Sequence, residues 1–115
     1  MAEEKPIDPI AEGKRIAGNY LSQLGWAREW RRTVTREIKP AWTRQDMEDK
    51  FTRANEMEEQ AEANFSTEYE RIRKNTDPVS KQILVEIYKL LANRNDLGFI
   101  GKRIVARIKD SLRNY

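Results

Sequence analysis

The sequence predicts an all-α protein, an up-and-down helical bundle with a long helical hairpin followed by two shorter helices. Apolar residues recur every three or four positions along most of the 115 residues, which is the spacing of one helix face. Helix-breaking and helix-capping residues interrupt this pattern at Asp8-Pro9, Pro40 to Thr43, and Asp77-Pro78. Only 38% of the residues are hydrophobic and 36% are charged, so folding depends on this regular spacing.

The first helix is predicted from Pro9 to about Lys39, after a flexible lead-in over residues 1–8. Residues 9–115 then form a single helical domain. Asp8 is the expected N-cap and Pro9 the first helical residue. The apolar stripe consists of Ile16, Tyr20, Leu24, Ala27, Trp30, Val34 and Ile38. Gly18 and Gly25 each cost about 1 kcal/mol relative to alanine, so either one continuous helix or two helices divided near Gly25 fit the pattern.

The second helix is predicted from about Arg44 to Lys74. Pro40 ends the first helix, because proline has no backbone N–H and disfavours helix in the preceding residue. Trp42 is expected to pack at the end of the hairpin, and Thr43 with Asp46 resembles a capping box. The middle of this helix is poor in apolar residues and rich in glutamates, for which we expect a solvated acidic face: Glu56, Glu58, Glu59 and Glu62.

The third and fourth helices are short. Asp77 and Pro78 start the third, which is the most hydrophobic segment and is expected at the centre of the core. Residues 97–101 are expected to be an apolar connection, with the last helix running from about Lys102 to Arg113. At 1.5 Å per residue the first two helices are each roughly 45 Å long and the last two roughly 20 Å. The end of the hairpin would therefore need a protein partner or a second copy of the chain to cover it.

The chain contains neither cysteine nor histidine. Thiol nucleophiles, zinc–thiolate sites, disulfides and Ser–His–Asp or Cys–His catalytic sites are therefore excluded. The glutamate cluster lacks the histidines of di-iron bundles, and Gly98 with Gly101 lacks the spacing of a phosphate-binding loop. We expect a protein that is not an enzyme and uses no metal or cofactor.

No apolar run approaches the roughly 20 residues of a transmembrane helix. The N-terminal residues are polar and lack the apolar stretch of a signal peptide. The sequence therefore predicts no transmembrane segment and a cytoplasmic location. A chain from which a targeting segment had been removed would have the same features.

Charge is segregated along the chain. Residues 1–45 carry 9 basic and 6 acidic side chains, residues 46–77 carry 5 and 10, and residues 78–115 carry 8 and 3. An acidic second helix thus lies between two basic segments. The opposite charges either pair within the molecule, or at least one basic face meets an acidic partner.

The segment around two tryptophans is the first candidate for binding a protein partner. Tryptophan and arginine are enriched at interface hot spots. Trp30 belongs to the apolar stripe and is expected in the core, whereas Trp26 is offset from the stripe. The candidate partner-binding residues are Trp26 and, roughly on the opposite flank of the helix, Arg28, Arg31 and Arg32.

The last helix is the second candidate, as a nucleic-acid-binding element. Its outer face carries five basic residues, Lys102, Arg103, Arg107, Lys109 and Arg113. They suit phosphates better than base edges, and the alternative is an ordinary solvated face. The leading hypothesis is a non-enzymatic helical adaptor or accessory factor that binds a protein. Nucleic-acid binding is the alternative, and self-association is left open. A third possibility is peripheral binding to an anionic membrane surface, for which Phe99 and Ile100 would supply apolar residues beside the basic face.

Overall fold

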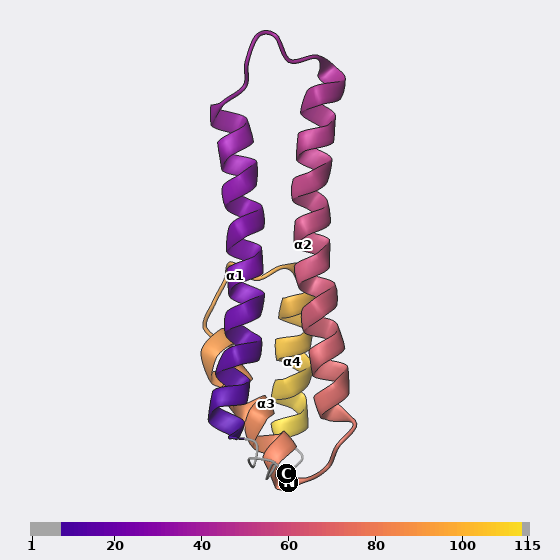
Figure 1. Ribbon diagram of the computed structural model, residues 1–115. Coiled ribbons are helices and arrows are strands. Elements are labelled where there is room, and N and C mark those ends of the chain that lie inside the picture. The colour runs from indigo at the N-terminus through magenta and orange to yellow at the C-terminus, as the bar shows by residue number, and fades with distance from the viewer. Residues whose placement is uncertain (1–7, 114–115) are drawn as a thin grey trace, which may run out of the picture.

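The computed structural model describes residues 8–113, which form four helices: α1 (Pro9–Arg36), α2 (Arg44–Arg73), α3 (Pro78–Leu91) and α4 (Phe99–Arg113). They run alternately up and down, with α1 and α2 as a long hairpin and α3 and α4 about half as long (Figure 1). The predicted all-α bundle is confirmed. Apart from Asp8, the predicted lead-in lies outside the described residues.

The helices begin at the predicted capping residues. The side chains of Asp8 and Asp77 each accept a hydrogen bond from a backbone N–H in the first turn of their helix. Thr43 and Asp46 form the expected capping box: the Asp46 N–H donates to Oγ1 of Thr43 over 3.1 Å, and the Thr43 N–H donates to the Asp46 carboxylate over 2.9 Å. Local sequence alone therefore determines where the first three helices begin.

Two predicted boundaries need correction. α1 is continuous through Gly18 and Gly25, but it ends at Arg36 instead of Lys39 and leaves Ile38 outside the helix and 46% exposed. α4 begins at Phe99, so the last three residues of the expected apolar connection are its first turn. The earlier start has a tertiary cause, described below.

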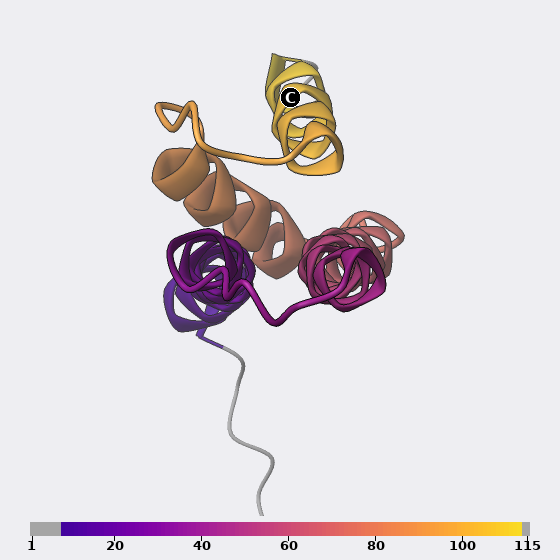
Figure 2. The same ribbon diagram turned by 90° about the horizontal axis from the view of Figure 1, so that it is seen from above.

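α1 and α2 form one layer, and α3 and α4 pack on one of its faces (Figure 2). The core cluster lies where the four helices meet. Its residues are Ile16, Ala17, Tyr20, Leu24, Ala61, Phe65, Tyr69, Ile72, Ile83, Leu84, Ile87, Leu91, Leu97, Ile104 and Ile108. α1 and α3 approach closely at Gly13, where an added Cβ would lie 2.5 Å from Cβ of Glu86.

The core cluster stops at Leu24 on α1 and Ala61 on α2, and the hairpin continues beyond it. We call residues 25–60 the free arm, because α3 and α4 cover only the other half of the hairpin (Figure 1). Inside the arm, Ala27 and Ala54 are fully buried and Val34 is 4% exposed. Small buried residues let the two helices of the arm pack together without a third layer.

Polar contacts also hold the arm together. The indole N–H of Trp30 donates to the backbone carbonyl of Lys50 over 3.2 Å. The ammonium group of Lys50 lies 4.9 Å from the ring centroid of Trp42, which is half-buried at the hairpin end as expected. Trp30 was expected in the core, but it is only half-buried and is not part of the core cluster. As the sequence predicts, neither α3 nor α4 reaches the end of the hairpin (Figure 1).

Candidate functional site

A buried polar network joins α1, α2 and the start of α4. The hydroxyl of Tyr20 donates a hydrogen bond to one oxygen of Glu62 over 2.6 Å, and the N–H of Gly101 donates to the other over 2.8 Å. The N–H of Gly98 donates to the Tyr20 oxygen over 3.2 Å. Glu62 is 8% exposed, so these donors replace water at both carboxylate oxygens.

The Glu62 carboxylate caps α4 from another helix. The carbonyl of Gly98 accepts the first helical bond of α4, from Lys102, but glycine has no side chain to receive the N–H groups of the first turn. Glu62 supplies this acceptor, and its negative charge faces the positive end of the helix dipole. This interaction explains why α4 starts three residues before the predicted Lys102.

Two glycines make room for the network. A Cβ on Gly98 would lie 2.7 Å from Cδ of Glu62, and one on Gly101 would lie 2.7 Å from Cε2 of Tyr20, with the polar oxygens closer still. Neither glycine has a positive φ, so they are needed for space and not for backbone conformation. The ring of Tyr20 also stacks on Phe65, with centroids 4.3 Å apart, and burial raises the pKa of its hydroxyl.

The network holds apolar side chains out in solvent. Phe99, the first residue of α4, is 79% exposed, and Ile100 is 39% exposed. We call residues 98–100 the ledge. Together with Ala63 and the α2 side chains of Asn55, Glu58 and Glu59, it lines a hollow of about 430 Å³ at the base of the free arm. An exposed aromatic residue on a rigid support is typical of a binding surface.

Four arginines on the arm segment of α1 line a second hollow with Thr35. They are Arg28, Arg31, Arg32 and Arg36, which we call the arginine wall. Arg31 crosses to α2, where it contacts Glu58 over 2.6 Å and Asn55 over 2.5 Å. Because both of these α2 residues also line the hollow above the ledge, the two hollows adjoin across this bridge.

The structure separates Trp26 from the three arginines predicted with it. Trp26 is 69% exposed and lines a groove on the α1–α2 seam with Gln23, Met57, Gln60, Ala61 and Asn64. This groove shares Gln23 and Asn64 with a neighbouring hollow that reaches Arg15 and Glu68. It therefore runs along the hairpin face opposite α3 and α4. The predicted site consists of two surfaces on opposite faces of the arm.

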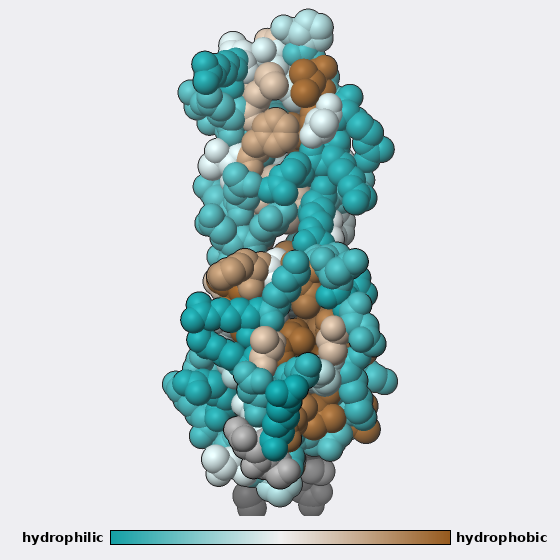
Figure 3. Space-filling model, turned by 180° about the vertical axis from the view of Figure 1, so that it is seen from behind, coloured by the Kyte–Doolittle hydropathy of each residue, from teal (hydrophilic) through white to brown (hydrophobic). Residues whose placement is uncertain are grey.

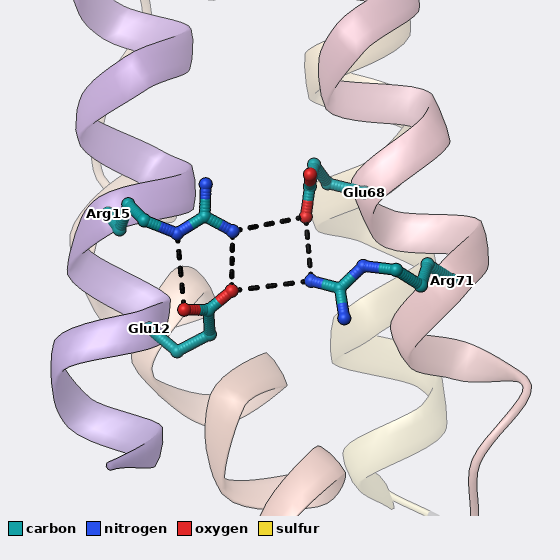
Figure 4. A network of polar contacts seen from close by, with 4 residues as sticks. All are labelled: Glu12, Arg15, Glu68 and Arg71. Carbon is teal, nitrogen blue, oxygen red and sulfur yellow. Dashed lines mark hydrogen bonds and ion pairs between the residues drawn. The ribbon is translucent and has the colours of Figure 1, made fainter. Parts of the chain in front are cut away.

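A network of ion pairs lies on the same face as the Trp26 groove, nearer the chain ends (Figure 4). Arg15 contacts Glu12 and, over 3.4 Å, Glu68, while Arg71 contacts Glu12 over 3.3 Å and Glu68 over 2.8 Å. Hydrogen bonding from Arg15 lowers the pKa of Glu12 despite partial burial. The network ties α1 to α2 and leaves no net charge on this part of the seam.

The five basic residues predicted on the last helix all lie on its exposed surface. None of Lys102, Arg103, Arg107, Lys109 and Arg113 makes an ion pair with another residue in the range 8–113.

Seen from the side of α3 and α4, hydrophobic surface gathers over the half of the molecule that holds these helices, whereas much of the arm is hydrophilic (Figure 3).

The expected acidic face on α2 is wrong for one of its four members. Glu56 and Glu59 are exposed and Glu58 pairs with Arg31, but Glu62 is buried in the network described above. Among residues 8–113, no three acidic side chains come together as potential metal ligands. The sequence does not predict the role of Glu62, because its partners Tyr20 and Gly101 are about 40 residues away along the chain. The one local signal is the pair Gly98 and Gly101, which flank Phe99.

Comparison with known proteins finds no matching family model, curated protein or solved structure. Within the part of the chain that the structure describes, no helix combines the length and the apolar character required to cross a bilayer.

Proposed function

We propose that the protein is a non-enzymatic adaptor that binds a protein partner through the free arm and the ledge. The observation that carries the proposal is Phe99, which is 79% exposed although its backbone is fixed by a buried carboxylate, a buried tyrosine and two glycines. Surface hydrophobic residues are common singly. Here the residue borders a hollow and lies beside the half of the hairpin that α3 and α4 leave uncovered.

A partner on this surface would gain affinity in two ways. Burying Phe99 and Ile100 would remove apolar surface from water. The ledge would also lose little conformational freedom on binding, because the network already holds it in place. Trp26, on the opposite face of the arm, stays a second candidate contact.

The test compares two exposed apolar residues at different places on the molecule. The tagged full-length protein would capture its partner from the native source, and Phe99→Ser should lose that partner. Val79→Ser is the matched control, since Val79 is 41% exposed in the first turn of α3, away from the arm. Both variants should keep the parent's circular dichroism. Equal capture by Phe99→Ser and the parent would show that the ledge is not the binding surface. Trp26→Ala in the same assay tests the opposite face.

Nucleic-acid binding through α4 is a second candidate, supported by the five exposed cations that have no ion-pair partner in the described chain. Such a face would contact phosphates. Base reading in the manner of a helix–turn–helix is less favoured, because the N-terminus of α4 faces Glu62 and lies beside the arm. Titration of labelled duplex and single-stranded DNA and RNA at low salt decides this candidate, since phosphate contacts weaken steeply as salt rises. Absence of binding at low salt would eliminate it.

A further inference from the structure

The hollow above the ledge and the hollow along the arginine wall share no lining residue but adjoin, and we call the two together the recess. The ledge is its apolar floor, and the wall rises from it along α1. The two parts are joined by the contacts of Arg31 with Glu58 and Asn55, which span the arm. Arg28 lies near the floor, close enough to Asp96 of the α3–α4 connection to lower the pKa of that carboxyl slightly, after the main effect of Arg94.

The recess carries unbalanced positive charge along α1. Among the described residues, the four arginines of the wall have two carboxylate partners. Glu29 pairs with Arg32 over 3.9 Å and with Arg36 over 3.1 Å, and Glu58 pairs with Arg31. The side chains of Arg32 and Arg36 are 73% and 68% exposed. The α1 side of the recess therefore carries two positive charges in excess, whereas the α2 side of the hollow above the ledge carries Glu59 and the buried Glu62. A complementary partner is apolar toward the ledge and acidic on the flank that faces α1.

The shape of the recess suits a helix. From Arg28 to Arg36 the wall is about 12 Å long, which equals about two helical turns. The described chain offers no strand edge to which an extended peptide could add. Nearer the chain ends, α3 already packs as a helix on the same face of the hairpin (Figure 2). A partner helix on the arm would continue that layer beyond the ledge.

We propose that this recess binds an amphipathic helix of a different protein, with its apolar face on Phe99 and Ile100 and an acidic flank along the arginine wall. The inference rests on the proposed adaptor function and specifies the chemistry of the partner. The acidic flank would pair with Arg28 and Arg32, leaving the internal bridge of Arg31 intact.

A second copy of the chain does not fit the recess. If two arms met face to face in antiparallel orientation, the two α1 helices would lie opposite each other, and the arginine wall of one copy would face that of the other. If they met in parallel, α3 and α4 of the two copies would occupy the same space, because both pack on this face (Figure 2). Like charges directly opposed disfavour the first arrangement, and steric overlap excludes the second.

Two synthetic peptides test the proposal on the full-length protein. Both are amphipathic helices of about five turns with the same leucine face, and they differ only in a flank of glutamates or of lysines. Fluorescence anisotropy at low salt should show the glutamate peptide binding about tenfold or more tightly than the lysine peptide, with the difference shrinking as salt screens the charges.

Charge reversal locates the binding surface. The double variant Arg28→Glu with Arg32→Glu should weaken the glutamate peptide about tenfold and favour the lysine peptide. The control Lys109→Glu with Arg113→Glu changes the net charge of +3 by the same amount at the far end of α4, and should leave both affinities unchanged. If the two peptides bind equally, if neither binds, or if only the α4 variant loses the glutamate peptide, the acidic-helix inference is wrong.

The adaptor function and the acidic helix can be refuted separately. Loss of the captured native partner in Phe99→Ser, combined with no preference between the peptides, would keep the adaptor proposal and overturn the acidic helix. Full capture of the native partner by Phe99→Ser would exclude the ledge as the binding surface, and full capture by Trp26→Ala as well would overturn the adaptor proposal itself. Light scattering of the full-length chain adds an independent check: a dimer that Arg28→Glu with Arg32→Glu dissociates would show that the recess binds a second copy after all.

Discussion

Replacing Gly101 by alanine should destabilise the protein, although alanine is the better helix former. Gly101 is buried in the first turn of α4, and the space where a Cβ would be placed is occupied by the hydroxyl and ring of Tyr20. That hydroxyl is hydrogen-bonded to Glu62, which in turn accepts from the Gly101 N–H. The added methyl must therefore displace the side chain that organises the network, or push α4 away from α1.

The free energy of unfolding should fall by about 2–3 kcal/mol. Overpacking a well-packed site costs about 1–3 kcal/mol. Disturbing hydrogen bonds to a buried charged group adds about 1–2 kcal/mol. The greater helix propensity of alanine offsets about 1 kcal/mol at most. For a chain of this length, the loss corresponds to a melting temperature lower by roughly 10 °C.

Urea and thermal unfolding followed by circular dichroism would measure the change, with Gly18→Ala as the matched control. Gly18 is exposed in the middle of α1, and no atom lies within 4 Å of an added Cβ. The same substitution there should raise stability by about 1 kcal/mol, because only the helix propensity changes. The two variants should thus shift in opposite directions. A Gly101→Ala protein as stable as the parent would refute the close approach of α4 to Tyr20.

Three further predictions concern the middle of α1, the start of α2 and the α1–α2 seam. Gly25→Ala should also stabilise the protein by about 1 kcal/mol in urea unfolding, because the site is open and α1 is continuous through it; a loss of stability would indicate a break in the helix there. Thr43→Ala should cost about 1 kcal/mol by removing the acceptor of the Asp46 N–H, and a double variant with Asp46→Ala should lose less than the sum of the two single changes. Glu12→Gln should reduce the sensitivity of stability to acid. Arg15 lowers the pKa of Glu12 below its ordinary value of 4.5, so the stabilisation exists above about pH 4.5 and is lost as pH falls through the lowered pKa. Urea midpoints at neutral pH and at about pH 3 should differ less in Glu12→Gln than in the parent, and an equal difference would remove Glu12 from the acid response.

The candidate site could be predicted only in part. The exposed position of Trp26 follows from its offset from the apolar stripe, and it is 69% exposed in the structure. The exposure of the basic residues of α4 follows from their place opposite Ile104 and Ile108. The sequence indicates Phe99 and Ile100 only as apolar residues that could contact a membrane surface. Their place in a hollow beside the free arm was not predicted, because it depends on the contact of Gly101 with Glu62, 39 residues away.

The sequence by itself determined the helices of this protein and their order. Asp8, Thr43 and Asp77 cap helices through hydrogen bonds to residues two or three positions away, so a local pattern contains all the information. The tertiary structure decided how the surfaces are arranged. Glu62 meets Tyr20 and Gly101 across separations of 42 and 39 residues, and only packing brings a carboxylate to the start of a distant helix. That contact fixes Phe99 in an exposed position at the base of the free arm.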